Sequence, residues 1–335
     1  MSSMAGQSVL FIGIGFYDYE AAIADELRRR GATVHLYNEL PDSVLKGMLS
    51  PLLRRLKVDA SQRIRTHHER ILAETADQQI SQVFVIKGEW LEPWFLEALR
   101  ARHPAAEFIA YHWDSLTRSP KLVELRAHFD RAYTFDPEDA RRLPAFRFRP
   151  LFFRNAMTAA EGTIPRYDLS FVGWMHHTRL RQVQTLAEAA ERRGLSVFFY
   201  LYTGLFSYVA LLLKGAARFV HARTLKYDDY AAVAAASSVI VDLPHPLQTG
   251  LTMRAIETVG AGKKMITTAR DIAQYDFFRP ENIFVIDDDH PHIDAEFLAL
   301  APVPVDARII ARYSLQSWVD EVFGLASTEP AARER

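Results

Sequence analysis

The sequence contains no cysteine. Disulfide bonds, thiolate nucleophiles and cysteine-based zinc sites are therefore excluded, and any covalent chemistry must use oxygen, nitrogen or carboxylate groups. The formal net charge is only -1, so no global basic excess indicates a nucleic-acid partner. No apolar run approaches the ~20 residues that a membrane span requires, and no basic region precedes the first apolar run, so we expect a cytoplasmic protein.

The length of 335 residues, of which 49% are hydrophobic, fits two globular domains of about 150 residues each. An apolar run over 8–14 is followed by apolar residues at helical spacing, a glycine at Gly31 and a second apolar run, which predicts a β-α-β unit. Further strands are expected at 82–88, 107–113 and 131–136. The first half therefore predicts a doubly wound parallel sheet.

Between 137 and 167 the periodicity is lost, and we place the domain junction there because prolines cluster in this segment. The alternation then resumes, with strands expected at 169–175, 196–202, 238–243, 264–268 and 282–287. We predict an α/β fold of two Rossmann-like, doubly wound domains facing across a cleft. The expected boundaries are 1–150, 151–312 and a terminal helix with a disordered tail over 313–335.

The stretch "FIGIGFYDY" carries Gly13 and Gly15 but lacks the third glycine of a dinucleotide-binding motif. It favours a tight strand-to-helix turn that uses the conformational freedom of glycine, and NAD binding is not expected. If the loop is functional, Gly15 and Tyr17 face the cleft.

Large polar and aromatic side chains follow the predicted strand 107–113 in "AYHWDSLTRSP". Ligands bind at the carboxyl ends of strands in open α/β sheets, so His112, Trp113 and Asp114 are candidate site residues. Asp114 suits a general base or nucleophile, and Trp113 suits a stacking surface. The alternative is that Asp114 or Ser115 caps the next helix. For Asp136, which precedes a proline and two acidic residues, the helix cap is the favoured interpretation.

A second strand end lies in "FVGWMHHTRLRQ". Gly173 lets a ligand approach the backbone, and His176 and Arg179 stand near a helix start that suits an anionic phosphate. Adjacent histidines do not share a helix face, and no HxH or HExxH spacing occurs, so we expect no metal.

The densest group of polar residues lies in "HPLQTGLTMRAIETVGAGKK". At this strand-to-helix turn, Arg254 could neutralise a phosphate or carboxylate, and Glu257, three residues later, shares its face and could accept two sugar hydroxyls. The alternative is a capped amphipathic helix with a surface pair of Arg254 and Glu257. Four further residues of the turn offer amide, hydroxyl and backbone donors, namely Gln248, Thr249, Gly250 and Thr252.

These motifs, with "YHWDS" and "YDFFRPENIFVID", resemble bacterial GT-B glycosyltransferases of capsule and O-antigen assembly over about 107–287. The resemblance implies a nucleotide-sugar donor on the C-terminal domain and a glycan or lipid-linked glycan acceptor on the N-terminal domain. A carboxylate on the helix after the donor loop corresponds to Glu257, but the second glutamate of many retaining members is replaced in "HPLQ", which leaves retention or inversion open. The group is also similar to retaining transferases of Kdo, an acidic sugar carried on CMP, and Asp114 is then the natural nucleophile.

The sequence thus predicts a glycosyltransferase of surface-polysaccharide biosynthesis that needs no cofactor and no metal, because helix amides and arginine would stabilise the leaving group. Asp114 and His112 are the predicted catalytic residues, and Gly15, Tyr17 and Trp113 the predicted acceptor-binding residues. The predicted donor-binding residues are Gly173, His176, Arg179, Gln248, Thr249, Gly250, Thr252, Arg254 and Glu257. Two alternatives stay open, a non-catalytic nucleotide-sugar binding module and a nucleotide-sugar epimerase.

Two segments rich in leucine and basic residues, 45–72 and 205–223, fit peripheral contact with the inner face of the inner membrane. The alternative for each is an amphipathic helix that packs on its own domain.

Overall fold

A computed structural model of the chain describes residues 3–15, 18–41, 44, 60–117, 119–154, 157, 164–176, 178–246 and 248–325. The chain divides into two compact units, one formed by Met1–Arg149 with Leu315–Arg335 and the other by Pro150–Ser314. Tyr17, most of the first basic segment and the tail after residue 325 lie outside the described residues. Among the residues that are described, no helix is both long and apolar enough to cross a bilayer.

The first unit is built on a parallel sheet with the strand order β2-β1-β3-β4-β5-β6. The predicted strands are present within a few residues of their expected bounds. They are β1 (Ser8–Gly13), β2 (Thr33–Asn38), β3 (Gln82–Ile86), β4 (Glu107–His112) and β5 (Arg131–Thr134), to which the structure adds the short β6 (Arg147–Phe148).

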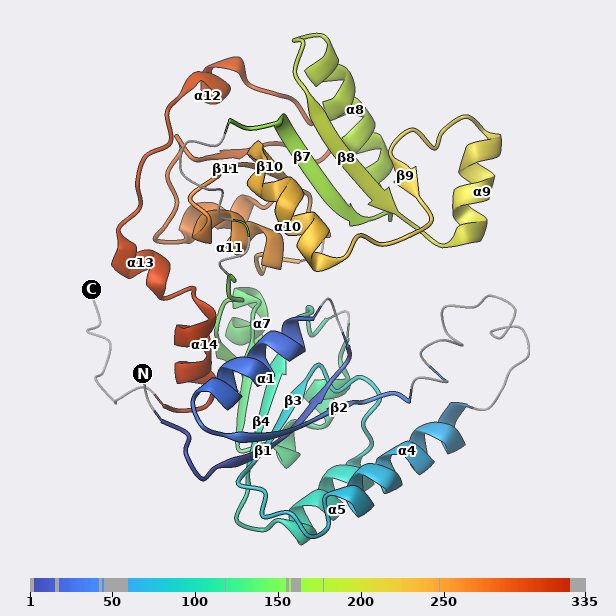
Figure 1. Cartoon of the computed structure of the whole chain (residues 1–335), viewed down its shortest axis with the longest axis vertical. Helices are drawn as coiled ribbons and strands as arrows, with labels where there is room; N and C mark the ends of the chain where they lie inside the picture. Colours follow the sequence, from blue (N-terminus) through green and yellow to red (C-terminus); the bar gives the residue numbers. More distant parts are fainter. Residues whose placement is uncertain are drawn as a thin grey trace. The chain divides into compact units, whose positions relative to one another are not determined.

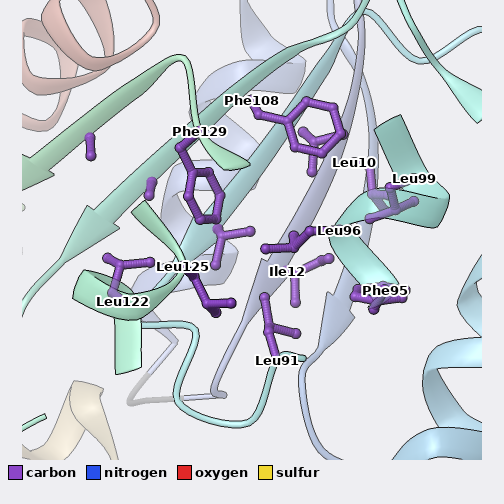
Figure 2. Close-up of a cluster of buried hydrophobic side chains, with 14 of the residues drawn as sticks. Leu10, Ile12, Leu91, Phe95, Leu96, Leu99, Phe108, Leu122, Leu125 and Phe129 are labelled. Atoms are coloured by element: carbon purple, nitrogen blue, oxygen red, sulfur yellow. The ribbon is translucent and has the colours of Figure 1, made fainter. Parts of the chain in front are cut away.

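One face of this sheet is covered by α4 (Ala60–Glu74) and α5 (Pro93–Arg102). Figure 2 shows the core that results, in which Leu10 and Ile12 of β1 meet Phe95, Leu96 and Leu99 of α5. Alternate residues of a strand point to opposite faces, so the nearly continuous apolar runs of β1, β3 and β4 supply a core on both faces.

On the other face, α1 (Tyr19–Arg29) contacts the terminal helix α14 (Leu315–Val322) (Figure 1). Trp318 of α14 is fully buried, and its ring centroid lies 4.8 Å from that of Tyr111 and 6.1 Å from that of Phe84. Arg30 adds hydrogen bonds to Asp320 and to the backbone carbonyl of Gln316. The sequence periodicity predicts α14, but only these long-range contacts show that it belongs to the first unit.

The second unit contains a parallel sheet with the order β12-β11-β10-β7-β8-β9. The fold class predicted from the sequence, α/β with doubly wound parallel sheets, is confirmed. The strands are β7 (Tyr167–Trp174), β8 (Val197–Tyr202), β9 (Val220–His221), β10 (Ser237–Asp242), β11 (Lys264–Thr267) and β12 (Ile283–Val285).

Helices cover both faces of the second sheet. Val183 and Leu186 of α8 (Arg179–Glu191) join Leu169, Val239 and Val241 in one core cluster. The helices that connect the strands elsewhere are α9 (Leu205–Leu213), α10 (Tyr227–Ala235) and α11 (Met253–Gly260). Smaller elements are α6 (Lys121–Glu124), α7 (Pro137–Arg142), α12 (Ala295–Ala299), α13 (Ala307–Ala311) and two 3-10 turns at Arg126–His128 and Arg270–Gln274.

Candidate functional site

The strand order of the second unit reverses between β7 and β10, which are neighbours in the sheet although β8 and β9 lie between them in sequence. Ligands of open α/β sheets bind outside the carboxyl ends of the strands at such a switch point. Gly173 and Trp174 end β7, Asp242 ends β10, and α11 begins at Met253. The two polar stretches singled out in the sequence therefore meet at one edge of the sheet.

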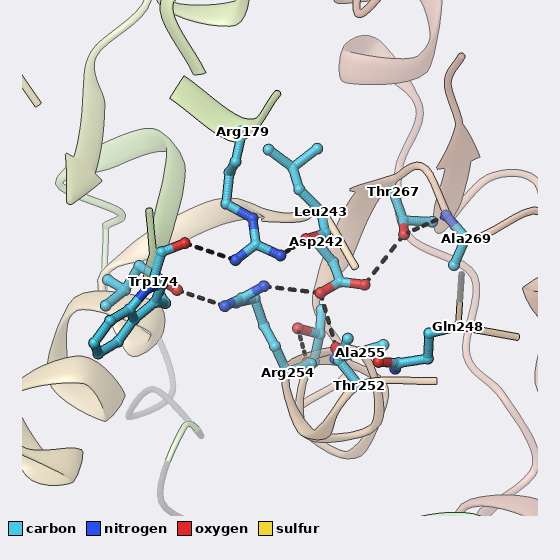
Figure 3. Close-up of polar contacts among 12 residues, drawn as sticks. Trp174, Arg179, Asp242, Leu243, Gln248, Thr252, Arg254, Ala255, Thr267 and Ala269 are labelled. Atoms are coloured by element: carbon cyan, nitrogen blue, oxygen red, sulfur yellow. Dashed lines mark hydrogen bonds and ion pairs between the residues drawn. The ribbon is translucent and has the colours of Figure 1, made fainter. Parts of the chain in front are cut away.

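Asp242 is the centre of this edge (Figure 3). It is fully buried, and its Oδ1 accepts hydrogen bonds from the Thr252 hydroxyl at 2.8 Å and from Nη1 of Arg254 at 2.9 Å. The Thr267 hydroxyl lies 3.2 Å from Oδ2. Buried carboxylates are stable only when charged or polar partners surround them, and here α11 with its N-cap and β11 supply those partners.

Arg254 is held against the end of β7. Its Nη2 donates to the carbonyl of Val172, and its guanidinium lies 4.6 Å from the centroid of the Phe171 ring. A Cβ atom at Gly173 would lie 3.2 Å from Nη2 and 2.9 Å from the Phe171 ring. The absence of a side chain at Gly173 thus makes room for Arg254. In this position 16% of the Arg254 side chain is exposed.

Arg179, the first residue of α8, brings a second guanidinium to the same edge. It donates from Nη1 to the carbonyl of Trp174 at 2.8 Å and from Nη2 to the carbonyl of Leu243 (Figure 3). Burial, and then the nearby charge of Arg254, lower the pKa of Arg179 to about 10, while Asp242 opposes this shift. Arg179 therefore stays charged at neutral pH. Two guanidinium groups at one strand end suit an anion.

The loop before α11 carries the other predicted donor-binding residues. Gln248 donates from Nε2 to the carbonyl of Gly250 at 2.7 Å, and Thr252 caps α11 by accepting from the amide of Ala255 at 3.0 Å. Gln248 and Thr249 are partly exposed, whereas Gly250 is buried. The loop thus orders the first turn of α11, whose backbone N–H groups have no partner within the helix and suit a phosphate.

His176 contributes an aromatic contact at this edge, because its ring centroid lies 5.5 Å from that of His245. Trp174 is 46% exposed and packs edge-on against Tyr202 at the end of β8, with a centroid distance of 5.1 Å. These rings offer apolar surface beside the arginines. His177 lies outside the described residues.

Glu257 does not form the surface pair with Arg254 that one interpretation of the sequence predicts. Its side chain is fully buried and accepts a hydrogen bond from the Tyr227 hydroxyl at 2.6 Å, which ties α11 to α10. Helical spacing predicts the two charges on one face, but Arg254 turns to Asp242 instead, with its Nη1 2.9 Å from Oδ1. Contact between Glu257 and a sugar or ribose stays a prediction.

In the first unit, Asp114 follows β4 as predicted and forms an ion pair with Lys87, whose Nζ lies 2.7 Å from Oδ2. The side chains of Lys87 and Asp114 are 23% and 35% exposed, so both can meet solvent or a ligand. The capping alternative for Asp114 and Ser115 is wrong, because the next helix, α6, begins after Pro120. The capping interpretation of Asp136 is confirmed, since its side chain accepts from the amides of Glu138 and Asp139.

His112 is fully buried, and its Nδ1 contacts the carbonyl oxygen and, at 3.3 Å, the amide nitrogen of Asp114. Burial lowers the pKa of His112 to about 4, so the ring is neutral at neutral pH. A buried neutral ring bonded to the backbone fixes the loop that carries Asp114. Contact of His112 with a reacting group stays a prediction.

Gly15 has a φ of +73°, which glycine adopts readily, and it donates its N–H to Oε1 of Glu20 at 3.0 Å. Phe16 and Tyr17 lie outside the described residues, so the tight turn stays a prediction. Nearby at the end of β2, Glu39 is 1% exposed and accepts a hydrogen bond from the amide of Trp90 at 3.2 Å. Burial raises the pKa of Glu39 to about 8, although the charge of Lys87 opposes this shift. The roles of Gly15 and Trp113 toward an acceptor stay predictions.

Sequence reasoning missed Asp242, which is the residue that organises the site. The signal was present, because Asp242 is the last residue of a predicted parallel strand, the same position that singled out the His112–Asp114 stretch. Its partners could not be read from the sequence, since they lie 10, 12 and 25 residues away along the chain.

No protein-family model and no curated protein sequence matches this chain. The solved structures that share its fold include three at 12–15% sequence identity. Sucrose-phosphate synthase from Thermosynechococcus elongatus aligns over 95% of this chain and 94% of its own, with a TM-score of 0.56 and 15% identity. AviGT4, a glycosyltransferase of avilamycin A biosynthesis, covers 95% of this chain and 96% of its own, with a TM-score of 0.59 and 13% identity.

Anabaena HepE, solved in complex with UDP and glucose, covers 96% of this chain and 99% of its own at a TM-score of 0.51 and 12% identity. The chain therefore has the GT-B fold of these glycosyltransferases.

Proposed function

We propose that this chain is a glycosyltransferase that moves a sugar from a nucleotide donor to a growing bacterial surface glycan. One observation carries the proposal, namely that the guanidinium groups of Arg179 and Arg254 lie beside Asp242 at the switch point of a GT-B sheet. A fixed cationic site of this kind binds phosphate before the reaction and stabilises the charge of the departing nucleotide during it.

We propose that the second unit binds the donor. The phosphate oxygens would accept hydrogen bonds from Arg254 and from the first N–H groups of α11, and Arg179 would add positive charge. The loop of Gln248, Thr249 and Gly250 would contact the sugar, and His176 and Trp174 would provide surface for the nucleotide. The UDP in the complex of the fold neighbour HepE supports a nucleotide as the class of ligand. Since the arginines and helix amides supply the positive charge, the proposed reaction needs no metal.

We propose that the first unit binds the acceptor and supplies the reacting carboxylate, Asp114. As a general base, Asp114 would take the proton of an acceptor hydroxyl. The hydroxyl oxygen would bond to the anomeric carbon of the donor sugar, and the nucleotide would leave with the electron pair of the broken C–O bond. As a nucleophile, Asp114 would first bond to that carbon as the nucleotide leaves with the electron pair of the C–O bond. In a second step the acceptor hydroxyl would bond to the carbon, Asp114 would leave as a carboxylate, and the hydroxyl proton would pass to the departed nucleotide phosphate or to water. His112 would position the loop in either mechanism, and Trp113 would stack on the acceptor.

The acceptor that we propose is a glycan or lipid-linked glycan of the O-antigen or capsule class, reached at the inner face of the inner membrane. CMP-Kdo is one candidate donor, because the group of glycosyltransferases that the chain resembles is also similar to retaining transferases of Kdo.

A thermal-shift series with UDP-, GDP-, dTDP- and CMP-sugars identifies the donor class, because a ligand that binds only the native state raises its melting temperature. The donor that stabilises the chain is then supplied in labelled form, with and without a glycan acceptor. We expect label to enter the acceptor. Binding without consumption of the donor would instead indicate a binding module, and release of an epimer without acceptor would indicate an epimerase.

A further inference from the structure

Helix α9 (Leu205–Leu213) presents its apolar side chains to solvent. Leu205, Phe206 and Leu213 are 61%, 68% and 84% exposed, and Val209 and Leu212 are 43% and 55% exposed. In contrast to α1, α8 and α11, α9 contains no buried residue. Figure 1 shows α9 standing out beside β9 at the margin of the second unit.

The exposed residues occupy one side of the helix. At 3.6 residues per turn, the five large apolar side chains fall within an arc of roughly 120°. The opposite side carries Tyr208 and Leu211, which are partly buried and pack against the core cluster of the second unit. The orientation of α9 is therefore fixed by its inner side, and the wider apolar side faces outward.

The chain that follows α9 is basic. Residues 205–226 include Lys214, Arg218, Arg223 and Lys226 and contain no aspartate or glutamate. Arg218 is paired with Glu191, whereas Lys214, Arg223 and Lys226 are exposed and form no salt bridge with any described residue.

We propose that α9 is a docking surface for anionic lipid headgroups. An apolar arc on a short helix that is followed by exposed basic residues fits the boundary between acyl chains and anionic headgroups, where the apolar side chains insert and the cations remain at the surface. A protein partner would have to bury the same apolar side and offer acidic groups as well, whereas an anionic bilayer provides both. The nine residues of α9 are too few to span a bilayer, which requires about 20.

This inference deepens the proposed function, because a transferase held at the membrane meets a lipid-linked acceptor, but its test does not depend on turnover. The full-length chain is floated with phosphatidylcholine vesicles and with vesicles that also contain phosphatidylglycerol. We expect binding to the anionic vesicles, weaker binding at high salt because ions screen the cations, and little binding to phosphatidylcholine alone.

The variant Leu205→Ser/Phe206→Ser/Leu213→Ser should lower the partition coefficient for anionic vesicles by at least about tenfold, because it removes the apolar insertion. The charge variant Lys214→Glu/Arg223→Glu should lower it as well. The matched control, Ile164→Ser/Leu300→Ser, changes exposed apolar residues of the same unit that lie outside α9, and should bind as the parent chain does.

Equal vesicle binding by the parent chain and the serine variant would overturn the proposal. So would a concentration-dependent dimer that the serine variant abolishes, since α9 would then be covered by a second copy. Transfer to a water-soluble acceptor should be unchanged in the serine variant, so loss of lipid binding and failure of the proposed function are separate results.

Discussion

Arg254 pairs with Asp242 and not with Glu257, although Glu257 is three residues away on the same helix and Asp242 is at the end of another element. The distance from Nη1 of Arg254 to Oδ1 of Asp242 is 2.9 Å, and the carboxylate is fully buried. The pair connects the first turn of α11 to the carboxyl end of β10. It fixes the direction of the arginine that we propose to bind the donor phosphate.

The substitution Asp242→Asn should destabilise the second unit. The amide keeps the shape of the side chain but removes the negative charge, so the buried Arg179 and the largely buried Arg254 lose the carboxylate beside them. We expect the free energy of unfolding to fall on the order of 3 kcal/mol, measured by urea denaturation. The conservative replacement Asp168→Asn, at a partly exposed hydrogen-bonding aspartate in the same unit, is the control. Equal losses in the two variants would show that the buried pair contributes nothing particular.

The substitution Asp114→Ala should reduce sugar transfer by about 10²- to 10⁴-fold, which is the usual contribution of a positioned acid or base. Binding of the donor, followed by calorimetry, should be nearly unchanged because its proposed site is in the other unit. The matched control is Asp25→Ala, which removes an exposed carboxylate that also forms an ion pair, in this case with Arg28. Undiminished transfer by the Asp114 variant would refute the assignment.

The buried Glu39 should make stability depend on pH. Its pKa is raised from 4.5 to about 8 in the folded chain, so between these values the folded state holds a proton that the unfolded state has lost. Stability from this group is therefore fully present below pH 4.5 and is lost as the pH rises through about 8.

The variant Glu39→Gln resembles the protonated side chain and should lack this loss. Urea midpoints of both proteins across the window should show the variant gaining relative to the parent chain as the pH rises, with each unit of pKa shift worth about 1.4 kcal/mol. Parallel curves for the two proteins would contradict the raised pKa.

A methyl group at Gly260 should not fit. A Cβ atom there would lie 2.2 Å from the ring of Phe153, which packs on the last turn of α11. We expect Gly260→Ala to cost about 1–3 kcal/mol of stability through this overlap. The double variant with Phe153→Leu should recover part of the loss, as measured by thermal unfolding. A single variant as stable as the parent chain would show that the ring moves aside freely.

The sequence was sufficient to predict most strands and the carboxyl-end location of the site, because buried parallel strands are apolar runs of characteristic length and their ends follow from the same pattern. It was insufficient to predict the partner of Arg254. Helical spacing describes neighbours along one helix, whereas Asp242 reaches Arg254 across two elements, and its need for a counter-ion arises only from burial.

The exposure of α9 likewise could not be predicted from the sequence. The apolar composition of 205–213 is plain in the sequence, and such a run ordinarily predicts a buried helix. Which side of the helix meets the core depends on where β8 and β9 place it, and only the structure shows that the wider apolar side faces solvent.

The central claim is that Arg254 and its surroundings bind the phosphate of a nucleotide. Calorimetric titration of the full-length chain with nucleoside diphosphates, the monophosphate CMP and the matching nucleosides tests it most directly, together with Arg254→Lys, which keeps a charge beside Asp242 but loses the planar fork of donors. Arg308→Lys, on the exposed face of α13, is the control. We predict that at least one phosphorylated nucleotide binds more tightly than its nucleoside and that Arg254→Lys alone removes most of this difference. Nucleotides and nucleosides of equal affinity, or a difference that survives in Arg254→Lys, would contradict the account.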